Sequence, residues 1–148
     1  MAAAAVQVRV AANHAEVQVA KAILVVEDEP FVCEITCDVL SRQGYSVLWA
    51  RNVGEATKIF YRHSGQIAVL LCDAILPDGN GFALVKAFRR QSPALKLIVA
   101  SGYPPALLAN AFRDGPGTRF LTKPYSSVTL MTAVKNLLRE GTASEQVA

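Results

Sequence analysis

Several features that mark large classes of proteins are scarce or absent in this 148-residue sequence. Its three cysteines are too few for a disulfide framework, so a reducing cytoplasm is the expected location. No apolar run approaches the ~18 residues of a membrane-spanning helix, and residues 1–20 lack the basic start and unbroken apolar stretch of a signal peptide. Lysine and arginine form no patch or stripe, which argues against direct binding of nucleic acid.

The length allows one domain, since domains contain roughly 150 residues. Hydrophobic residues make up 52% of the chain, enough to form a buried core. We expect the folded domain to cover residues 21–140, between a mobile N-terminal extension over residues 1–20 and a C-terminal tail over residues 141–148. That tail is too short for a DNA-binding or enzymatic output domain, so the output is expected to act through a partner protein.

Acidic residues are concentrated in one short segment, although the net charge of the whole chain is +3. Five of the twelve acidic residues fall within residues 27–38. This concentration of acidic charge first suggests a site for a cation.

Short apolar runs alternate with helical patterns along the chain, which predicts an α/β fold. Five strands are expected, each followed by a helix, and five units are too few for an eight-stranded barrel. The remaining architecture is a doubly wound parallel sheet with strand order 2-1-3-4-5 and a site at the carboxyl ends of the strands. The predicted strands are Ala22–Val26, Tyr45–Ala50, Ile67–Cys72, Leu95–Ala100 and Arg119–Thr122. The predicted helices are Pro30–Gln43, Asn52–His63, Phe82–Arg90, Ala106–Arg113 and Ser127–Arg139. The helix Ala106–Arg113 is expected to be short or displaced, because prolines and glycines flank it.

The first predicted helix carries apolar residues at helical spacing, which are expected to face the sheet. They are Phe31, Val32, Ile35, Thr36, Val39 and Leu40. Cys33 and Cys37 lie four residues apart on the same helix. No third metal ligand is near them in the sequence, so we expect them to pack at the edge of this apolar face.

Polar residues follow the predicted strands at the edge where a site is expected. Glu27 and Asp28 follow the first strand, Asp73 follows the third, Ser101 the fourth and Lys123 the fifth. If the first and third strands are neighbours, the three acidic side chains meet in one pocket. Carboxylate oxygens suit Mg²⁺, while the lysine supplies a positive charge and the serine a hydroxyl. These five residues together predict a binding site for a divalent metal and a phosphoryl group, with a carboxylate as nucleophile.

Four motifs, in this order, resemble the receiver domain of bacterial two-component response regulators. They are the strand-end acids of VVEDE, the spacing Asp73-x-x-x-Pro77-x-x-x-Gly81, the pair Ser101-Gly102 and the pair Lys123-Pro124. The resemblance covers about residues 21–140 and implies a flavodoxin-like (βα)5 fold. It implies a module that takes a phosphoryl group from a phosphohistidine and then changes conformation to regulate a partner protein.

The resemblance also implies a metal and a phosphoacceptor at named positions. Asp73 is the implied phosphoacceptor. Mg²⁺ is the implied cofactor, held by Glu27, Asp28, Asp73 and the backbone carbonyl of Ile75.

The remaining site residues have implied roles in transfer and switching. Lys123 pairs with the phosphoryl oxygens, and Ser101 bonds to one of them after transfer. Ser101 and Phe120 form the implied conformational switch, and the Lys123–Pro124 bond is expected to be cis.

The implied partners are a histidine kinase or histidine phosphotransfer protein as phosphodonor and a downstream protein target. The target is expected to bind the face formed by the fourth helix, the fifth strand and the fifth helix. Chemistry by the chain itself is limited to self-phosphorylation and autodephosphorylation, so we expect a regulatory domain rather than an enzyme. Neither a nucleic acid nor a membrane is an expected partner.

Three alternatives are compatible with parts of this pattern. The chain can be a receiver excised from a hybrid sensor kinase, because the residues after the fourth and fifth strands are similar to those receivers. A flavodoxin-like flavin carrier shares the strand order, but Glu27-Asp28-Glu29 would repel the flavin phosphate. An aspartate-based phosphatase also uses Mg²⁺, but it normally has a second aspartate where Ile75 stands.

Overall fold

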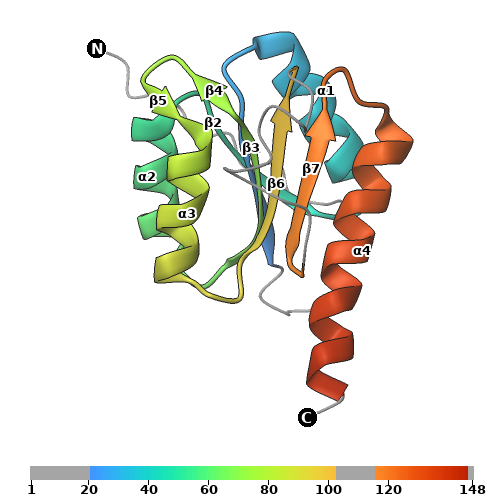
Figure 1. Ribbon diagram of the computed structural model, residues 1–148. Helices are drawn as coiled ribbons and strands as arrows, with labels where there is room; N and C mark the ends of the chain where they lie inside the picture. Colours follow the sequence, from blue (N-terminus) through green and yellow to red (C-terminus); the bar gives the residue numbers. More distant parts are fainter. Residues whose placement is uncertain (1–20, 103–115, 147–148) are drawn as a thin grey trace.

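The core of the protein is a five-stranded parallel sheet (Figure 1). The computed structural model describes residues 21–102 and 116–146, with side chains through residue 140. The strands are β1 (Ala22–Val26), β2 (Ser46–Ala50), β3 (Ile67–Asp73), β6 (Lys96–Ser101) and β7 (Thr118–Thr122). Their order, β2-β1-β3-β6-β7, confirms the predicted order 2-1-3-4-5. Each strand end lies within one residue of its prediction.

Four helices lie in the described part of the chain, two on each face of the sheet (Figure 1). They are α1 (Pro30–Arg42), α2 (Val53–Arg62), α3 (Gly81–Gln91) and α4 (Ser127–Gln146). Helices α1 and α4 cover one face, while α2 and α3 cover the other. The predicted helix Ala106–Arg113 falls outside the described residues. None of the four described helices has the length and apolar composition needed to cross a bilayer.

Helix α4 continues beyond its predicted end at Arg139 and runs to Gln146. Residues 141–148 were expected to form a tail because they are mostly small and polar, and Gly141 stands at their start. A single glycine costs a helix only about 1 kcal/mol relative to alanine. The alanine, glutamate and glutamine residues beyond it favour helix, and the backbone therefore stays helical through most of the expected tail.

Alternate residues of each strand point to opposite faces and enter two separate core clusters. On the α2–α3 side, Leu24 and Val26 pack with helix residues that include Phe60 and Phe88, whose rings stack with centroids 4.0 Å apart. On the α1–α4 side, Ile23 packs with residues of both of those helices. Burial of the strands on both faces is the reason why short apolar runs predicted them so well.

The face of α1 that contacts the sheet differs from the prediction. Phe31 is 79% exposed and Ile35 is 63% exposed, so the expectation that both face the sheet is wrong. The buried residues of α1 are Cys33, Thr36, Cys37 and Leu40. Apolar residues lie on more than one side of α1, so helical periodicity alone did not identify the side that is buried against the sheet. Small cysteine side chains at the centre of that stripe allow α1 to pack closely on the sheet.

A small hairpin between β3 and α3 is a second feature that the sequence did not predict. It pairs β4 (Ile75–Leu76) with β5 (Gly79–Asn80) in antiparallel fashion. The Asn80 side chain then caps α3 by accepting a hydrogen bond from the Phe82 backbone N–H at 2.8 Å. A Cβ atom at Gly81 would lie 2.0 Å from the Asp73 carbonyl oxygen, so only glycine fits there. Strands of two residues show no periodicity, and the segment therefore reads as a loop in the sequence.

Candidate functional site

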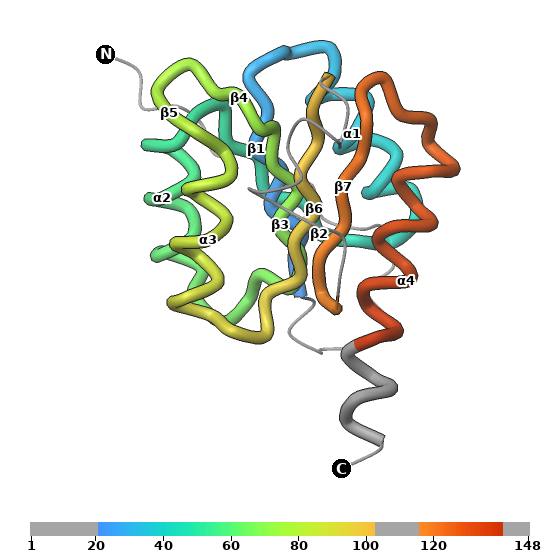
Figure 2. Tube along the Cα trace, in the orientation of Figure 1, coloured from blue at the N-terminus to red at the C-terminus, as the bar shows by residue number. Residues whose placement is uncertain are grey.

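The carboxyl ends of four neighbouring strands, β1, β3, β6 and β7, whose arrangement Figure 2 shows, carry the polar residues that the sequence singled out. Glu27 follows β1 directly, Asp73 ends β3, Ser101 ends β6 and Lys123 follows β7. Parallel pairing places all of these ends at the same edge of the sheet. The topology therefore brings together residues that are up to 96 positions apart in sequence.

Three carboxylates form a compact cluster at this edge. Glu27, Asp28 and Asp73 each offer an oxygen, and these oxygens lie within 4.8 Å of one another. The Oε2 atom of Glu27 is buried and has no hydrogen-bond partner among the described residues. A buried, unpartnered carboxylate oxygen beside two further carboxylates fits a hard divalent cation such as Mg²⁺.

Lys123 contacts two of the three carboxylates. Its Nζ donates to Glu27 Oε1 at 2.7 Å and to Asp73 Oδ2 at 2.8 Å. Burial by itself would lower the pKa of Lys123, but the hydrogen bonds to Asp73 and Glu27 raise it above its usual value. With all groups ionised, three negative charges and one positive charge leave a net charge of −2 in the cluster. One divalent cation would neutralise that charge.

Glu27 is the most strongly perturbed acid of the site. Burial is the main cause, and together with the neighbouring Asp73 carboxylate it raises the pKa of Glu27 to about 7, although Lys123 opposes the shift. Glu27 is buried because its backbone still follows the sheet, and its N–H donates to the Ala50 carbonyl at 3.0 Å. With a pKa of about 7, this carboxyl group is partly protonated near neutral pH, even though Lys123 contacts it.

Backbone contacts fix the surroundings of Asp73. The Ile75 N–H donates to Asp73 Oδ1 at 3.3 Å, and the Ala74 N–H donates to the Ala100 carbonyl at 2.9 Å. These bonds tie both the side chain and the following peptide to fixed partners. The backbone of Ile75, which is the predicted source of a carbonyl ligand, thus lies next to the Asp73 carboxylate.

The predicted switch residues lie on the two strands beyond β3. Ser101 is buried, and its carbonyl accepts a hydrogen bond from the Lys123 N–H at 2.8 Å. Phe120 is partly buried, pairs with Val99 in the sheet and packs against the core on the α2–α3 side. The Lys123–Pro124 peptide bond is cis, as predicted.

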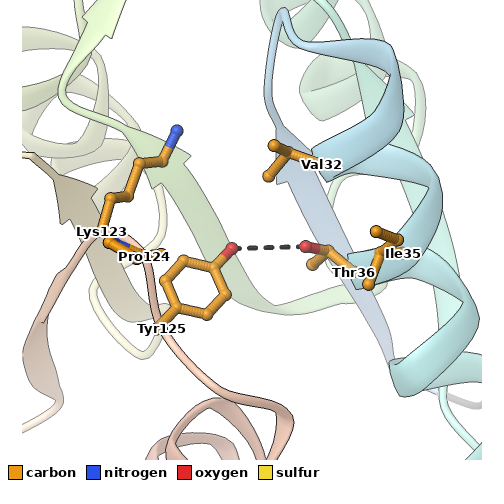
Figure 3. A pocket seen from close by; sticks show the side chains of 6 residues that line it. All are labelled: Val32, Ile35, Thr36, Lys123, Pro124 and Tyr125. Atoms are coloured by element: carbon orange, nitrogen blue, oxygen red, sulfur yellow. Dashed lines mark hydrogen bonds between the residues drawn. The ribbon is translucent and has the colours of Figure 1, made fainter.

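A pocket beside Lys123 was not predicted from the sequence. It has a volume of about 380 Å³ and lies between α1 and the segment after β7 (Figure 3). The Tyr125 hydroxyl and the Thr36 hydroxyl form a hydrogen bond across it at 3.3 Å. Its lining residues are Val32, Ile35, Thr36, Lys123, Pro124 and Tyr125. The partners of that bond are 89 residues apart, so no local pattern could have revealed it.

Trp49 provides a further contact to the site. Its indole Nε1 donates to the backbone carbonyl of Glu27 at 3.1 Å. Because the chain has a single tryptophan, any change in its fluorescence comes from Trp49, which lies next to Glu27. Trp49 is thus an intrinsic probe of the site.

Known proteins match the chain over most of its length. The family described as response regulator receiver domain matches residues 23–135. The sensor kinase CckA of Brucella abortus is 31% identical over 118 residues, which cover 80% of this chain and 12% of the kinase. The response regulator protein PilR of Pseudomonas aeruginosa is 33% identical, covering 78% of this chain and 26% of that regulator. The chain spans about half the length or less of the curated relatives it matches.

Solved structures of receiver domains also resemble this chain. The receiver domain of the hybrid histidine kinase CckA has a TM-score of 0.67 at 34% identity, covering 78% of this chain and 97% of that domain. A CheY-like receiver domain protein from Methanospirillum hungatei has a TM-score of 0.72 at 26% identity, covering 84% and 98%. These matches favour a receiver over the flavin carrier and the phosphatase. By fold, site geometry and sequence, the chain belongs to the response regulator receiver domain family, whose members are regulatory modules of two-component signalling.

Proposed function

We propose that Asp73 is the phosphoacceptor of this receiver and that a phosphohistidine on a partner protein is its phosphodonor. The observation that supports this most directly is the contact of the Lys123 ammonium group with both Asp73 and Glu27 inside the acidic cluster. A fixed positive charge at the acceptor carboxylate stabilises the charge of a transferring phosphoryl group. Positioning and charge neutralisation of this kind account for most of the catalysis of phosphoryl transfer.

In the proposed step, a carboxylate oxygen of Asp73 forms a bond to the phosphorus atom of the donor. The phosphorus–nitrogen bond breaks, and its electron pair stays on the leaving imidazole nitrogen, which takes a proton from solvent. Lys123 then pairs with the phosphoryl oxygens. Ser101, buried at the end of β6, bonds to one of them once the acyl phosphate has formed.

We further propose that Glu27, Asp28, Asp73 and the Ile75 carbonyl hold Mg²⁺. The net charge of the cluster and the unpartnered Oε2 atom of Glu27 support this assignment. When bound, Mg²⁺ would neutralise negative charge on the phosphoryl oxygens. Glu27 and Asp28 have no other role in the proposed chemistry.

The partners of the proposed reaction are proteins. A histidine kinase or a histidine phosphotransfer protein would supply the phosphoryl group. We propose that the output target binds a face that includes β7 and α4, where Phe120 would link the phosphorylation site to the surface; the predicted helix of that face falls outside the described residues. The relatives that match include both a sensor kinase and separate regulators. Beyond self-phosphorylation and autodephosphorylation no enzymatic turnover is proposed, and the cytoplasmic location stays a prediction.

Incubation with acetyl phosphate, with and without Mg²⁺, tests this function. We expect one phosphoryl group per chain by mass spectrometry, stable in acid and labile in base, and strongly dependent on Mg²⁺. The Asp73→Asn variant should take up none. Equal labelling of that variant, or no uptake by the natural chain under any metal condition, would contradict the proposal.

A further inference from the structure

The tip of the β4–β5 hairpin is attached to the beginning of α2. The Asp78 carboxylate accepts hydrogen bonds from two backbone N–H groups of this helix, with Oδ1 2.7 Å from Val53 N and Oδ2 3.1 Å from Gly54 N. Figure 1 shows the hairpin beside this end of the helix. The two segments are separated by 24 and 25 positions in sequence. One exposed side chain therefore joins the segment after Asp73 to a different structural element.

The same hairpin contacts α2 a second time, through its backbone. A Cβ atom added at Gly79 would lie 3.0 Å from Val53 Cγ2, so the hairpin backbone lies directly against this side chain. Val53 in turn packs against the core cluster on the α2–α3 side. The Asp78 carboxylate thus connects the hairpin to a residue that the core holds in place.

Asp78 shares the capping of α2 with a local residue. The Asn52 side chain accepts from the Glu55 N–H at 2.8 Å, while Asp78 accepts from Val53 and Gly54. A carboxylate at this end of a helix also interacts favourably with the helix dipole. The hydrogen bond from Val53 in particular holds the pKa of Asp78 below its usual value, so the group is charged at neutral pH.

The other end of the hairpin lies at the phosphorylation site. Ile75 N donates to Asp73 Oδ1 at 3.3 Å, and Gly81 N donates to the Ala74 carbonyl at 2.8 Å. The hairpin is therefore held at the site by one set of bonds and at its tip by Asp78. The Ile75 backbone lies in the hairpin between these two attachments.

We propose that Asp78 is a positioning residue for the metal: it ties the β4–β5 hairpin to α2 and so holds the Ile75 backbone where its carbonyl can bind Mg²⁺. This inference rests on the proposed function, in which Ile75 supplies that carbonyl. Asp78 itself touches neither the metal nor the phosphoryl group. Its effect belongs to the class of outer contacts that orient a metal ligand.

The test compares Asp78→Ala with Asn52→Ala in the full chain. Both variants remove a cap from the same helix end, but only the first releases the hairpin. Mg²⁺ titrations followed by Trp49 fluorescence should show binding about tenfold weaker in Asp78→Ala, and near the natural value in Asn52→Ala. Unfolding midpoints of both variants measure the loss of helix capping separately.

Phosphorylation by acetyl phosphate gives a second readout. In Asp78→Ala, the Mg²⁺ concentration for half-maximal rate should rise about tenfold, while the rate at saturating Mg²⁺ stays close to that of the natural chain. Unchanged Mg²⁺ affinity in Asp78→Ala, or an equal loss in Asn52→Ala, would overturn the positioning role and leave the proposed function intact. A natural chain that binds no Mg²⁺ would overturn the proposed function, and this inference with it.

Discussion

At the scale of single residues, the ammonium group of Lys123 lies between two carboxylates that repel each other. It contacts Glu27 at 2.7 Å and Asp73 at 2.8 Å from a half-buried position. A long, flexible lysine reaches both acids only because β7 ends at the same edge of the sheet as β1 and β3. Its charge is thus fixed where the proposed transfer would add negative charge.

Replacement of Lys123 by alanine should slow phosphorylation more than it weakens metal binding. Without the ammonium group, negative charge on the phosphoryl oxygens loses a preorganised partner, and the rate with acetyl phosphate should fall roughly a hundredfold. Mg²⁺ binding should be retained, because the variant removes a cation that competes for the same carboxylates. Lys135→Ala, on the exposed surface of α4, is the control and should behave like the natural chain. A loss of Mg²⁺ binding equal to the loss of rate would contradict this expectation.

Glu27 should make both stability and metal binding depend on pH. Its pKa is raised from about 4.5 to about 7 by burial and by Asp73, so the folded chain holds this proton more tightly than the unfolded chain. The resulting stabilisation is complete below pH 4.5 and is lost as the pH rises through 7. At about 1.4 kcal/mol per pKa unit, the loss in the metal-free protein amounts to about 3 kcal/mol.

The proposed Mg²⁺ ion would compete with that proton and should therefore bind more tightly as the pH rises. Between pH 6 and pH 7 the affinity should increase about fivefold, as measured by titration of Trp49 fluorescence. In Glu27→Gln the pH dependence over this range should largely disappear, both for Mg²⁺ affinity and for the free energy of unfolding in EDTA. A pH profile that is the same in this variant would assign the titration to another group.

Some residues of the site could be predicted from the sequence, and others could not. Glu27, Asp28 and Asp73 were expected to meet if the first and third strands are neighbours, because they stand at the ends of those strands, and the structure brings them together. Asp78 was not singled out. Its partners Val53 and Gly54 belong to another element, and an aspartate next to a glycine is typical of any turn. Contacts between loops depend on tertiary packing, which local patterns do not encode.

At the scale of elements, the prediction was accurate for the limits of the strands and wrong for the buried face of α1. Strands buried on both faces are continuous apolar runs, and their limits are visible in the sequence. Helix α1 has apolar residues on more than one side, and its choice of buried face depends on which residues fit the sheet. Cys33 and Cys37 occupy that face, which leaves Phe31 and Ile35 on the surface.

The exposed side of α1 should take part in binding the phosphodonor protein. Ile35 is 63% exposed and lines the pocket that also contains Lys123 (Figure 3). A donor that presents a phosphohistidine to Asp73 must cover this region, where apolar surface would be buried on contact. Ile35→Ser should therefore reduce transfer from a phosphorylated histidine phosphotransfer protein about tenfold, since burying an aliphatic side chain contributes about 1.5–3 kcal/mol.

Two comparisons show whether Ile35→Ser acts on docking of the donor protein rather than on folding or on the phosphorylation reaction. Phosphorylation of Ile35→Ser by acetyl phosphate should be unchanged, because that donor needs no protein surface. Tyr61→Ser removes a 56% exposed aromatic residue from α2, on the opposite face of the sheet, and transfer to it should be unaffected. If both serine variants lose transfer equally, the effect of Ile35 is not specific to the α1 side.

At the scale of the whole molecule, the acidic cluster destabilises the fold in which it is assembled. Folding brings three carboxylates within 4.8 Å of one another, and Lys123 neutralises one charge. The free-energy cost of the remaining repulsion must be offset by the two hydrophobic core clusters on either side of the sheet. If the proposed metal binds to this cluster, stability and metal binding would be linked through the same residues, since a ligand that binds only the folded state stabilises it.

Asp28→Asn should reverse the order of stability between the metal-free and the metal-loaded protein. In EDTA the variant should unfold at a higher temperature than the natural chain, because one of three repelling charges is gone. At a Mg²⁺ concentration of about 100 times the dissociation constant, the natural chain should gain about 2.7 kcal/mol, while the variant gains far less and becomes the less stable of the two. Glu34→Gln removes an exposed charge of α1 and should follow the natural chain in both buffers. Thermal unfolding of the three proteins, with and without Mg²⁺, measures all of these differences, and an Asp28→Asn protein that is less stable in EDTA would show that the cluster is compensated without a metal.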